Sequence, residues 1–242
     1  MRQSRVYTGQ PLAPGTEITL EAEAGHYLTR VLRLRAGETL VLYNGDGNDY
    51  AAELVSPRRD QVRVRVIARL PAVAESPLDL TLVQAISRGE RMDYSLQKAT
   101  ELGVTALQPL FTERVEVRLE ASRLVKRMAH WQAVIQAACG QCGRAMVPVL
   151  KAPLDLEDWL QAPAPGLRLV LTPEAELSIS TLDPIAVPVE LLVGPEGGLT
   201  EREHERCARS GVLGISMGPR ILRTETAGPA AIAVLQALFG DF

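Results

Sequence analysis

The sequence has few cysteines, few aromatic residues and almost no lysine, and it lacks any long apolar run. Three cysteines among 242 residues are an odd number, which argues against a disulfide-stabilised scaffold. No apolar stretch approaches the roughly 20 residues that a transmembrane helix needs, and the segment after Met1 lacks the apolar core of a signal peptide. We therefore expect a cytoplasmic protein with no membrane partner.

The amino-acid composition limits which residues can build the hydrophobic cores and which partners the protein can bind. Aromatic residues make up 4% and hydrophobic residues 46%, so Leu, Val, Ile and Ala must build the cores of one large domain or two. The net charge is −3, and lysine occurs only at positions 98, 126 and 151. This balance argues against indiscriminate nucleic-acid binding and permits a specific RNA partner. The first 72 residues, with ten arginines against eight acidic residues, are the more basic part.

Residues 1–72 have the pattern of a small β-barrel domain. Gln61–Leu70 alternates between apolar and charged side chains, and Asn44–Gly47 is a hairpin-turn signal between two strands. Arg63 and Arg65 fall on the polar face of that strand, where we expect them to be solvated rather than bound to RNA. Pro71–Pro77 has the composition of a linker.

Residues 73–242 alternate strands with helices, which predicts a parallel sheet with helices on its faces. Ligands of such sheets bind beyond the carboxyl ends of the strands, where Thr172, Gly194 and Met217 lie. The expected strands are Leu78–Ile86, Ala106–Leu110, Leu167–Leu171, Pro188–Val193 and Val212–Ile215, and the expected helices include Arg91–Leu102 and Glu120–Ala138.

Two glycine-marked turns follow strands in this second part of the chain. The first, Val193–Leu199, precedes a helix for which Thr200 and Glu203 form a capping box. The second lies within Gly214–Ala227 and leads to the last helix. Such turns present bare backbone N–H groups to a ligand. Neither matches the dinucleotide or phosphate-loop pattern, so spacing alone leaves a ligand site and an ordinary connection equally open.

Pro229 indicates where the last helix begins. Proline is tolerated in the first turn of a helix, so a start at Thr226 is favoured over a start at Thr224. Charges on a loop between two apolar elements indicate a site. The loop before the helix then carries three charged residues, Arg220, Arg223 and Glu225.

A zinc or redox site is an alternative interpretation of Cys139 and Cys142. A zinc ion needs two further ligands, and the remaining cysteine and histidines lack usable spacing. Redox pairs lie at a helix N-terminus, whereas this pair lies near the end of a long predicted helix. We therefore expect a structural role for both thiols and no metal. We expect His204 to be solvated on its charged helix.

Several motifs together resemble one family. They are Gly194–Leu199 with Glu203, Ile221–Ala227, Lys98–Gly103, the spacing of Gln141, Arg144 and Pro148, and, near the N-terminus, His26–Leu28, Val31–Arg33 and Asn44–Gly47. The chain thereby resembles the RsmE family of SPOUT methyltransferases, which modify N3 of a uridine in small-subunit ribosomal RNA. The match runs nearly from end to end.

The resemblance implies an α/β fold in two domains. Residues 1–72 would be a PUA-like β-barrel that binds RNA, and residues 73–242 a SPOUT methyltransferase domain with a trefoil knot from roughly Leu169 to Ala230. It also implies a homodimer, which would cover the last helix, Ala227–Phe239, because a helix that is apolar nearly all round must be buried. Two positions depart from the family: Gly140 replaces a frequent Glu, and Gly89-Glu90-Arg91 replaces a lysine-rich loop.

The implied cofactor is S-adenosylmethionine, and the implied partner is small-subunit ribosomal RNA or the assembled small subunit. No metal is required. The residues implied to bind the cofactor are Leu171, Thr172, Gly194, Pro195, Glu196, Gly197, Ile215, Met217, Gly218, Arg220, Ile221 and Leu222. Those implied to contact RNA are Arg5, Arg30, Arg33, Arg114, Gln141 and Arg144.

Methyl transfer to N3 of uracil requires removal of a weakly acidic proton and stabilisation of charge on the ring carbonyls. Arg223 suits the donor role, and Glu225 suits the role of the base or of a group that orients the base. Two alternatives stay open: a SPOUT methyltransferase acting on another RNA or base, and a non-catalytic RNA-binding protein. The barrel-like first domain disfavours the former, and the glycine turns disfavour the latter. The choice of uridine, of free or assembled substrate, and of proton acceptor stays open as well.

Overall fold

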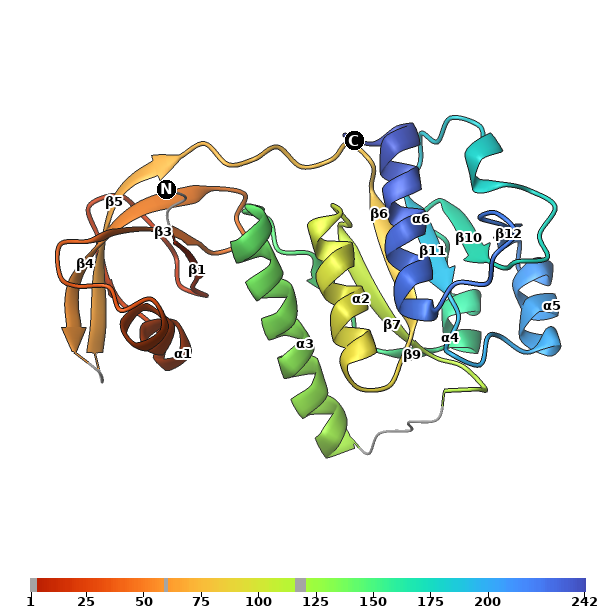
Figure 1. The fold of residues 1–242 in the computed structure, drawn as a ribbon, viewed down its shortest axis with the longest axis horizontal. Helices are drawn as coiled ribbons and strands as arrows, with labels where there is room; N and C mark the ends of the chain where they lie inside the picture. Colours follow the sequence, from red (N-terminus) through yellow and green to blue (C-terminus); the bar gives the residue numbers. More distant parts are fainter. Residues whose placement is uncertain (1–3, 59–60, 116–120) are drawn as a thin grey trace. The chain divides into compact units, whose positions relative to one another are not determined.

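The computed structural model describes residues 4–58, 61–115 and 121–242, which form two compact units (Figure 1). The first unit runs to Glu75 and includes Gln136–Val147, and the second comprises Ser76–Ile135 and Pro148–Phe242. No sequence pattern indicated that residues 136–147 belong with the first unit. The division into domains at 1–72 and 73–242 stays a prediction.

Five strands of the first unit form one sheet in the order β1-β3-β4-β5-β2. Strands β1 and β3 are parallel, and the other three pairs are antiparallel. In β5 the three alternate valines are buried, whereas Arg63 and Arg65 point outward and pair with Glu17. The bounds are β1 Arg5–Tyr7, β2 Glu17–Thr19, β3 Thr39–Tyr43, β4 Asp49–Arg58 and β5 Gln61–Leu70.

Two short segments of the first unit connect its strands. The predicted hairpin turn at Asn44–Gly47 joins β3 to β4, and Asp46 N donates a hydrogen bond to Asn44 Oδ1 at 3.2 Å. Between β2 and β3 the chain forms a helix, α1 (Ala22–His26), continued by a π-helical turn, η1 (Tyr27–Val31). The sequence pattern did not predict this helical connection.

The end of α3 (Ala121–Cys142) and the residues just after it pack within the first unit, where two hydrogen bonds hold them. Tyr43 Oη donates to the carbonyl of Gln136, and Arg5 Nη2 donates to the carbonyl of Arg144 at 2.9 Å. A Cβ at Gly140 would lie 3.3 Å from Tyr43 Oη, which is tighter than ordinary contact. A glutamate at position 140, frequent in the resembled family, would therefore require Tyr43 to shift.

The second unit is built on a parallel sheet in the order β12-β10-β11-β6-β7-β8, with β9 also paired to β7. The predicted parallel sheet is confirmed, and the strand predicted at Leu167–Leu171 has the observed bounds. The strands are β6 Leu80–Ala85, β7 Ala106–Phe111, β8 Val149–Leu150, β9 Leu154–Asp155, β10 Leu167–Leu171, β11 Val189–Val193 and β12 Leu213–Ile215.

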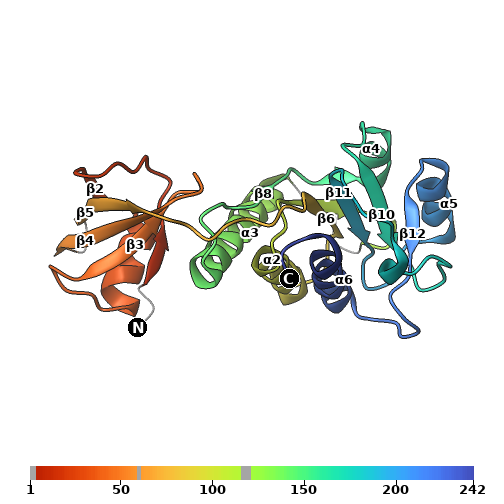
Figure 2. The same cartoon turned by 90° about the horizontal axis from the view of Figure 1, so that it is seen from above.

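Helices cover both faces of this sheet. Figure 2 shows α2 and α6 on one face and α4 and α5 on the other. Side chains alternate accordingly: Val83, Val170 and Leu192 pack with Trp159 of α4 in one buried cluster. No helix within the described residues is both long and apolar enough to cross a membrane. Besides α3, the helices are α2 Glu90–Glu101, α4 Leu156–Gln161, α5 Glu201–Arg209 and α6 Thr224–Phe239, with a short 3-10 turn at Ile179–Thr181.

The predicted start of the last helix at Thr226 is wrong, because α6 begins at Thr224. Thr224 is buried, and its hydroxyl donates to the carbonyl of Gly194 at 2.6 Å and accepts from Gln84 Nε2 at 3.0 Å. These tertiary bonds outweigh the cost of Pro229 inside the helix, where it has no N–H to give to the carbonyl four residues earlier. Glu225 therefore lies on the helix and not on the loop.

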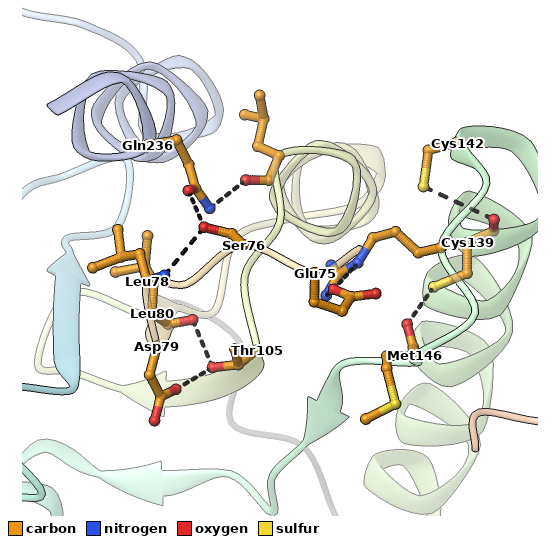
Figure 3. A network of polar contacts seen from close by, with 12 residues as sticks. Glu75, Ser76, Leu78, Asp79, Leu80, Thr105, Cys139, Cys142, Met146 and Gln236 are labelled. Carbon is orange, nitrogen blue, oxygen red and sulfur yellow. Dashed lines mark hydrogen bonds and ion pairs between the residues drawn. The ribbon is translucent and has the colours of Figure 1, made fainter. Parts of the chain in front are cut away.

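The last helix is buried along one face only within this chain. Its inward face includes Ile232, Leu235 and Gln236, whereas Leu238 is 44% exposed. Gln236 Nε2 donates to the carbonyl of Leu102 at 2.9 Å, and Gln236 Oε1 accepts from Ser76 Oγ at 2.6 Å (Figure 3). These bonds fix the end of α6 against the end of α2 and the segment that leads into β6.

Candidate active site

A pocket of about 570 Å³ lies in the second unit, beyond the carboxyl ends of β10, β11 and β12. Every residue that the resemblance implied for cofactor binding lines it, and so do Arg223 and Glu225. These residues come from separate strands and turns, and the parallel sheet brings them to one edge. Their roles stay predictions.

The first wall of the pocket is the turn after β11. Gly198 has φ of +68°, which favours glycine, and its N–H donates to the carbonyl of Pro195 at 2.9 Å. The predicted capping box is confirmed, since Thr200 Oγ1 accepts from Glu203 N and Glu203 Oε2 accepts from Thr200 N at 2.7 Å. Glu203 is buried, and its other oxygen accepts from Glu113 N at 2.8 Å. The single carboxylate of Glu203 therefore fixes the residues that follow the glycine turn.

The second wall is the segment between β12 and α6. Gly218 has φ of +72° and no atom within 4 Å of the position that a Cβ would take. Ile221 is 85% exposed at the rim, whereas Leu222 is half-buried and Ile215 is fully buried. The pocket thus has an apolar floor and an open rim that also carries Arg220 and Arg223.

Two carboxylates of the pocket share one arginine. Arg91 Nη1 lies 3.0 Å from Glu196 Oε1, and Arg91 Nε lies 3.7 Å from Glu225 Oε1. Burial opposes ionisation of Glu196, but hydrogen bonds from its own N–H, from Arg88 N and from Arg91 outweigh burial and hold its pKa below the usual value. Sequence reasoning missed Arg91, whose only signal was its place at the start of a predicted helix, where it is the second residue of α2.

A third carboxylate, Glu174, also lines the pocket, as does His204. Glu174 Oε2 accepts from Thr172 Oγ1 at 2.7 Å, and this bond, followed by the residue's own N–H, lowers the pKa of Glu174. His204 was expected to be solvated, but it is half-buried and lines the pocket. Neither Glu174 nor His204 was predicted as part of the site. The sequence motifs lie in the two glycine turns, whereas these two residues lie in other segments of the chain.

The residues predicted to contact RNA have unequal surroundings. Arg30 and Arg33 of the first unit are exposed, and Arg33 has φ of +55°, which residues other than glycine rarely adopt. The side chain of Arg5 is only 9% exposed and pairs with Asp49, so its guanidinium is engaged inside the unit.

Of the other three residues predicted to contact RNA, one is exposed and two are engaged in hydrogen bonds within the protein. Gln141 is exposed, whereas Arg144 is buried and its Nε donates to Glu75 Oε2 at 2.9 Å. In the second unit, Arg114 Nη1 donates to the carbonyl of Gly197 at 2.6 Å. Arg144 and Arg114 therefore hold the fold in place, whatever else they contact.

The cysteine pair lies at the end of α3, as predicted. Burial raises the pKa of the Cys139 thiol to about 12, so the thiol stays protonated at neutral pH. Its Sγ lies 3.6 Å from the carbonyl of Met146 (Figure 3). A protonated, buried thiol is a poor nucleophile and a poor metal ligand.

The sequence matches two protein families along most of its length. Residues 74–236 match the RNA methyltransferase domain family, and residues 20–67 match the RNA methyltransferase PUA domain family. Ribosomal RNA small subunit methyltransferase E of Buchnera aphidicola subsp. Schizaphis graminum is 33% identical over 241 residues, which cover 99% of this chain and 98% of that protein.

Two solved structures are similar over 100% of both chains. A methyltransferase of Legionella pneumophila in complex with its bound cofactor SAM is 39% identical, with a TM-score of 0.95. Ribosomal RNA small subunit methyltransferase E of Neisseria gonorrhoeae bound to S-adenosyl methionine is 36% identical, with a TM-score of 0.92.

Proposed function

The chain belongs to the family of ribosomal RNA small subunit methyltransferase E, and from this premise we propose that it methylates N3 of one uridine in small-subunit ribosomal RNA. It is an S-adenosylmethionine-dependent methyltransferase with a PUA-like domain before the methyltransferase domain. The observation that carries the proposal is the pocket in which both glycine turns and two candidate catalytic side chains meet.

The pocket fits the cofactor in shape and in charge. Its volume of about 570 Å³ lies within the usual range for small-molecule sites. A Cβ at Gly197 would lie 3.3 Å from Arg114 Cδ, so glycine keeps the turn packed on Arg114 while its backbone faces the pocket. Leu171, Ile215 and Leu222 would hold the adenine ring, and Glu174 and Glu196 would attract the cationic methionine part. When bound, the cofactor supplies an electrophilic methyl group on a sulfonium.

Arg223 and Glu225 flank the start of α6, where negative charge on the uracil carbonyls would be stabilised. Arg223 is the N-cap residue and is exposed, so its guanidinium is free to reach a bound base. The first turn of α6 also presents unpaired N–H groups and the positive end of the helix dipole. Glu225 has a side chain only 18% exposed and would accept the N3 proton or orient the group that does.

The remaining parts of the proposal concern partners and location. Arg30 and Arg33 would contact RNA from the PUA-like domain, whose partner is small-subunit ribosomal RNA, free or assembled. We also propose a homodimer, since the partly exposed face of α6 with Leu238 is apolar and a second copy would cover it. A cytoplasmic location would follow from this substrate.

The test is methyl transfer with nucleoside identification. The purified protein is incubated with labelled S-adenosylmethionine and small ribosomal subunits that lack the modification, and the RNA is then digested to nucleosides. The proposal requires label in 3-methyluridine. Label in another nucleoside would contradict the proposed target atom, and no transfer despite cofactor binding would move the activity to another RNA.

A further inference from the structure

A second groove lies in the same unit, between the start of α2 and the first half of α3. Its volume is about 600 Å³. The two helices run side by side in both views (Figures 1 and 2). We call it the α2–α3 groove. Its lining comprises Gly89, Glu90 and Asp93 from the α2 side, and Arg123, Lys126, Arg127, His130 and Trp131 from α3.

Three cations of α3 face this groove. Arg123, Lys126 and Arg127 are three and four residues apart, so they share one side of the helix. Within the described part of the chain, Arg123 and Lys126 are exposed and have no carboxylate partner. Arg127 lies with its guanidinium 6.0 Å from the ring centre of Trp131, which is buried and orients it. With His130 one turn further on, the basic row extends over roughly 10 Å.

The acidic residues of the groove do not neutralise its three cations Arg123, Lys126 and Arg127. Asp93 Oδ2 lies 2.7 Å from His130 Nε2, so that carboxylate is already engaged. Glu90 is exposed and lies at the first position of α2. Three arginines elsewhere in this unit are matched with acids: Arg168 with Glu190, Arg206 with Glu113 and Glu157, and Arg209 with Glu205. The groove therefore carries positive charge that its own acids do not match, although the whole chain is acidic.

The groove adjoins the pocket at the start of α2. Gly89 and Glu90 line the groove, and the next residue, Arg91, lines the pocket. The start of α2 is fixed on the glycine turn because Arg88 N and Arg91 Nη1 both donate to Glu196 Oε1, at 3.1 and 3.0 Å. An RNA strand that places one base in the pocket would therefore carry its neighbouring phosphates past the groove.

We propose that the α2–α3 groove binds the phosphate backbone of the substrate RNA beside the methylated nucleotide, through Arg123, Lys126 and Arg127. This inference rests on the proposed function for the identity of the ligand as RNA. Phosphate is the matching chemistry because flexible cations along a helix suit a chain of single negative charges. The start of α2, which has Gly89 as N-cap and no side-chain cap, adds the positive end of a helix dipole.

The test is RNA binding by a double variant of the full chain, Arg123→Gln with Lys126→Gln. Both side chains are exposed, so the fold should be retained. The probe is deproteinised small-subunit ribosomal RNA, and its affinity is measured by filter binding over a series of salt concentrations. We expect at least tenfold weaker binding at low salt. We also expect the slope of log affinity against log salt to fall by about 1.5, since each released phosphate contact contributes about 0.7 to 0.9.

Two further variants make the test specific. The control is Arg202→Gln with Arg209→Gln on α5, which removes the same charge from another exposed surface of the unit and should change RNA affinity less than twofold. A third variant, Glu90→Gln, should have the opposite effect on RNA affinity. It removes a negative charge from the groove and should strengthen RNA binding severalfold. The affinity for S-adenosylmethionine should stay the same in all of them.

Three results would overturn the proposal. One is wild-type RNA affinity and salt slope in the double variant, and another is an equal loss in the α5 control, which would indicate a general charge effect. The third is a smaller oligomer in light scattering with RNA affinity retained, which would assign the groove to a protein contact. Failure of the proposed function is distinct, because it would be seen as absent methyl transfer by the unaltered protein, and RNA binding does not depend on transfer.

Discussion

Replacing Thr224 by Val tests whether one buried hydroxyl joins the last helix to the cofactor pocket. The side chain is 6% exposed, and its Oγ1 bonds both the carbonyl of Gly194 and Nε2 of Gln84. Val has a similar shape but no polar atom, so the buried carbonyl loses a partner, at a cost of about 1–3 kcal/mol. The Gly194 carbonyl belongs to the pocket wall, so we expect the loss to change the pocket as well as the stability.

The assay is a calorimetric titration with S-adenosylmethionine, accompanied by urea unfolding. A loss of about 2 kcal/mol within the pocket corresponds to roughly thirtyfold weaker binding. Thr224→Ser keeps the hydroxyl and should restore most of the affinity. Thr226→Val, on an exposed position of the same helix, should bind the cofactor like the unaltered protein. If Thr224→Val were less stable but bound the cofactor within twofold of normal, the hydroxyl would stabilise the helix without shaping the pocket.

Three further predictions concern the carboxylates around the site. Glu203→Gln leaves Thr200 N or Glu113 N without an acceptor and should lower the free energy of unfolding by about 1–3 kcal/mol. The control, Glu201→Gln at an exposed position, should not lower it. Equal unfolding curves for the two variants would contradict this prediction. The pKa of Glu196 is lowered from 4.5 in the fold, so its stabilising contribution is complete above pH 4.5 and is lost as pH falls through the lower folded value. The difference in unfolding free energy between the unaltered protein and Glu196→Gln should therefore shrink in acid, and a constant difference would refute the assignment. Glu225→Gln should slow single-turnover methyl transfer while cofactor affinity stays within twofold, and an unchanged rate would remove Glu225 from the mechanism.

Elements defined by local patterns could be predicted from the sequence. The alternation of Gln61–Leu70 and the apolar run Leu167–Leu171 give the observed bounds of β5 and β10. The capping box at Thr200 was predicted because its two partners are only three residues apart. The pocket was predicted in outline because strand order places both glycine turns at one edge of a parallel sheet.

Features that depend on distant partners could not be predicted in the same way. The start of α6 is set by Gln84 and Gly194, which no helix rule takes into account. Arg91 and His204 join the pocket through packing of helices whose own patterns show only charged faces. The attachment of residues 136–147 to the first unit depends on bonds from Tyr43 and Arg5. The knot and the homodimer rest on the family resemblance and stay predictions.

Primer extension on small-subunit ribosomal RNA tests the central claim most directly. A methyl group on N3 of uridine blocks base pairing, so reverse transcriptase stops one nucleotide before it. Our account predicts one new stop, one nucleotide before a uridine, that requires both this protein and S-adenosylmethionine and is reduced in Glu225→Gln. A stop one nucleotide before another base, or extension without any new stop although label from the cofactor enters the RNA, would contradict it.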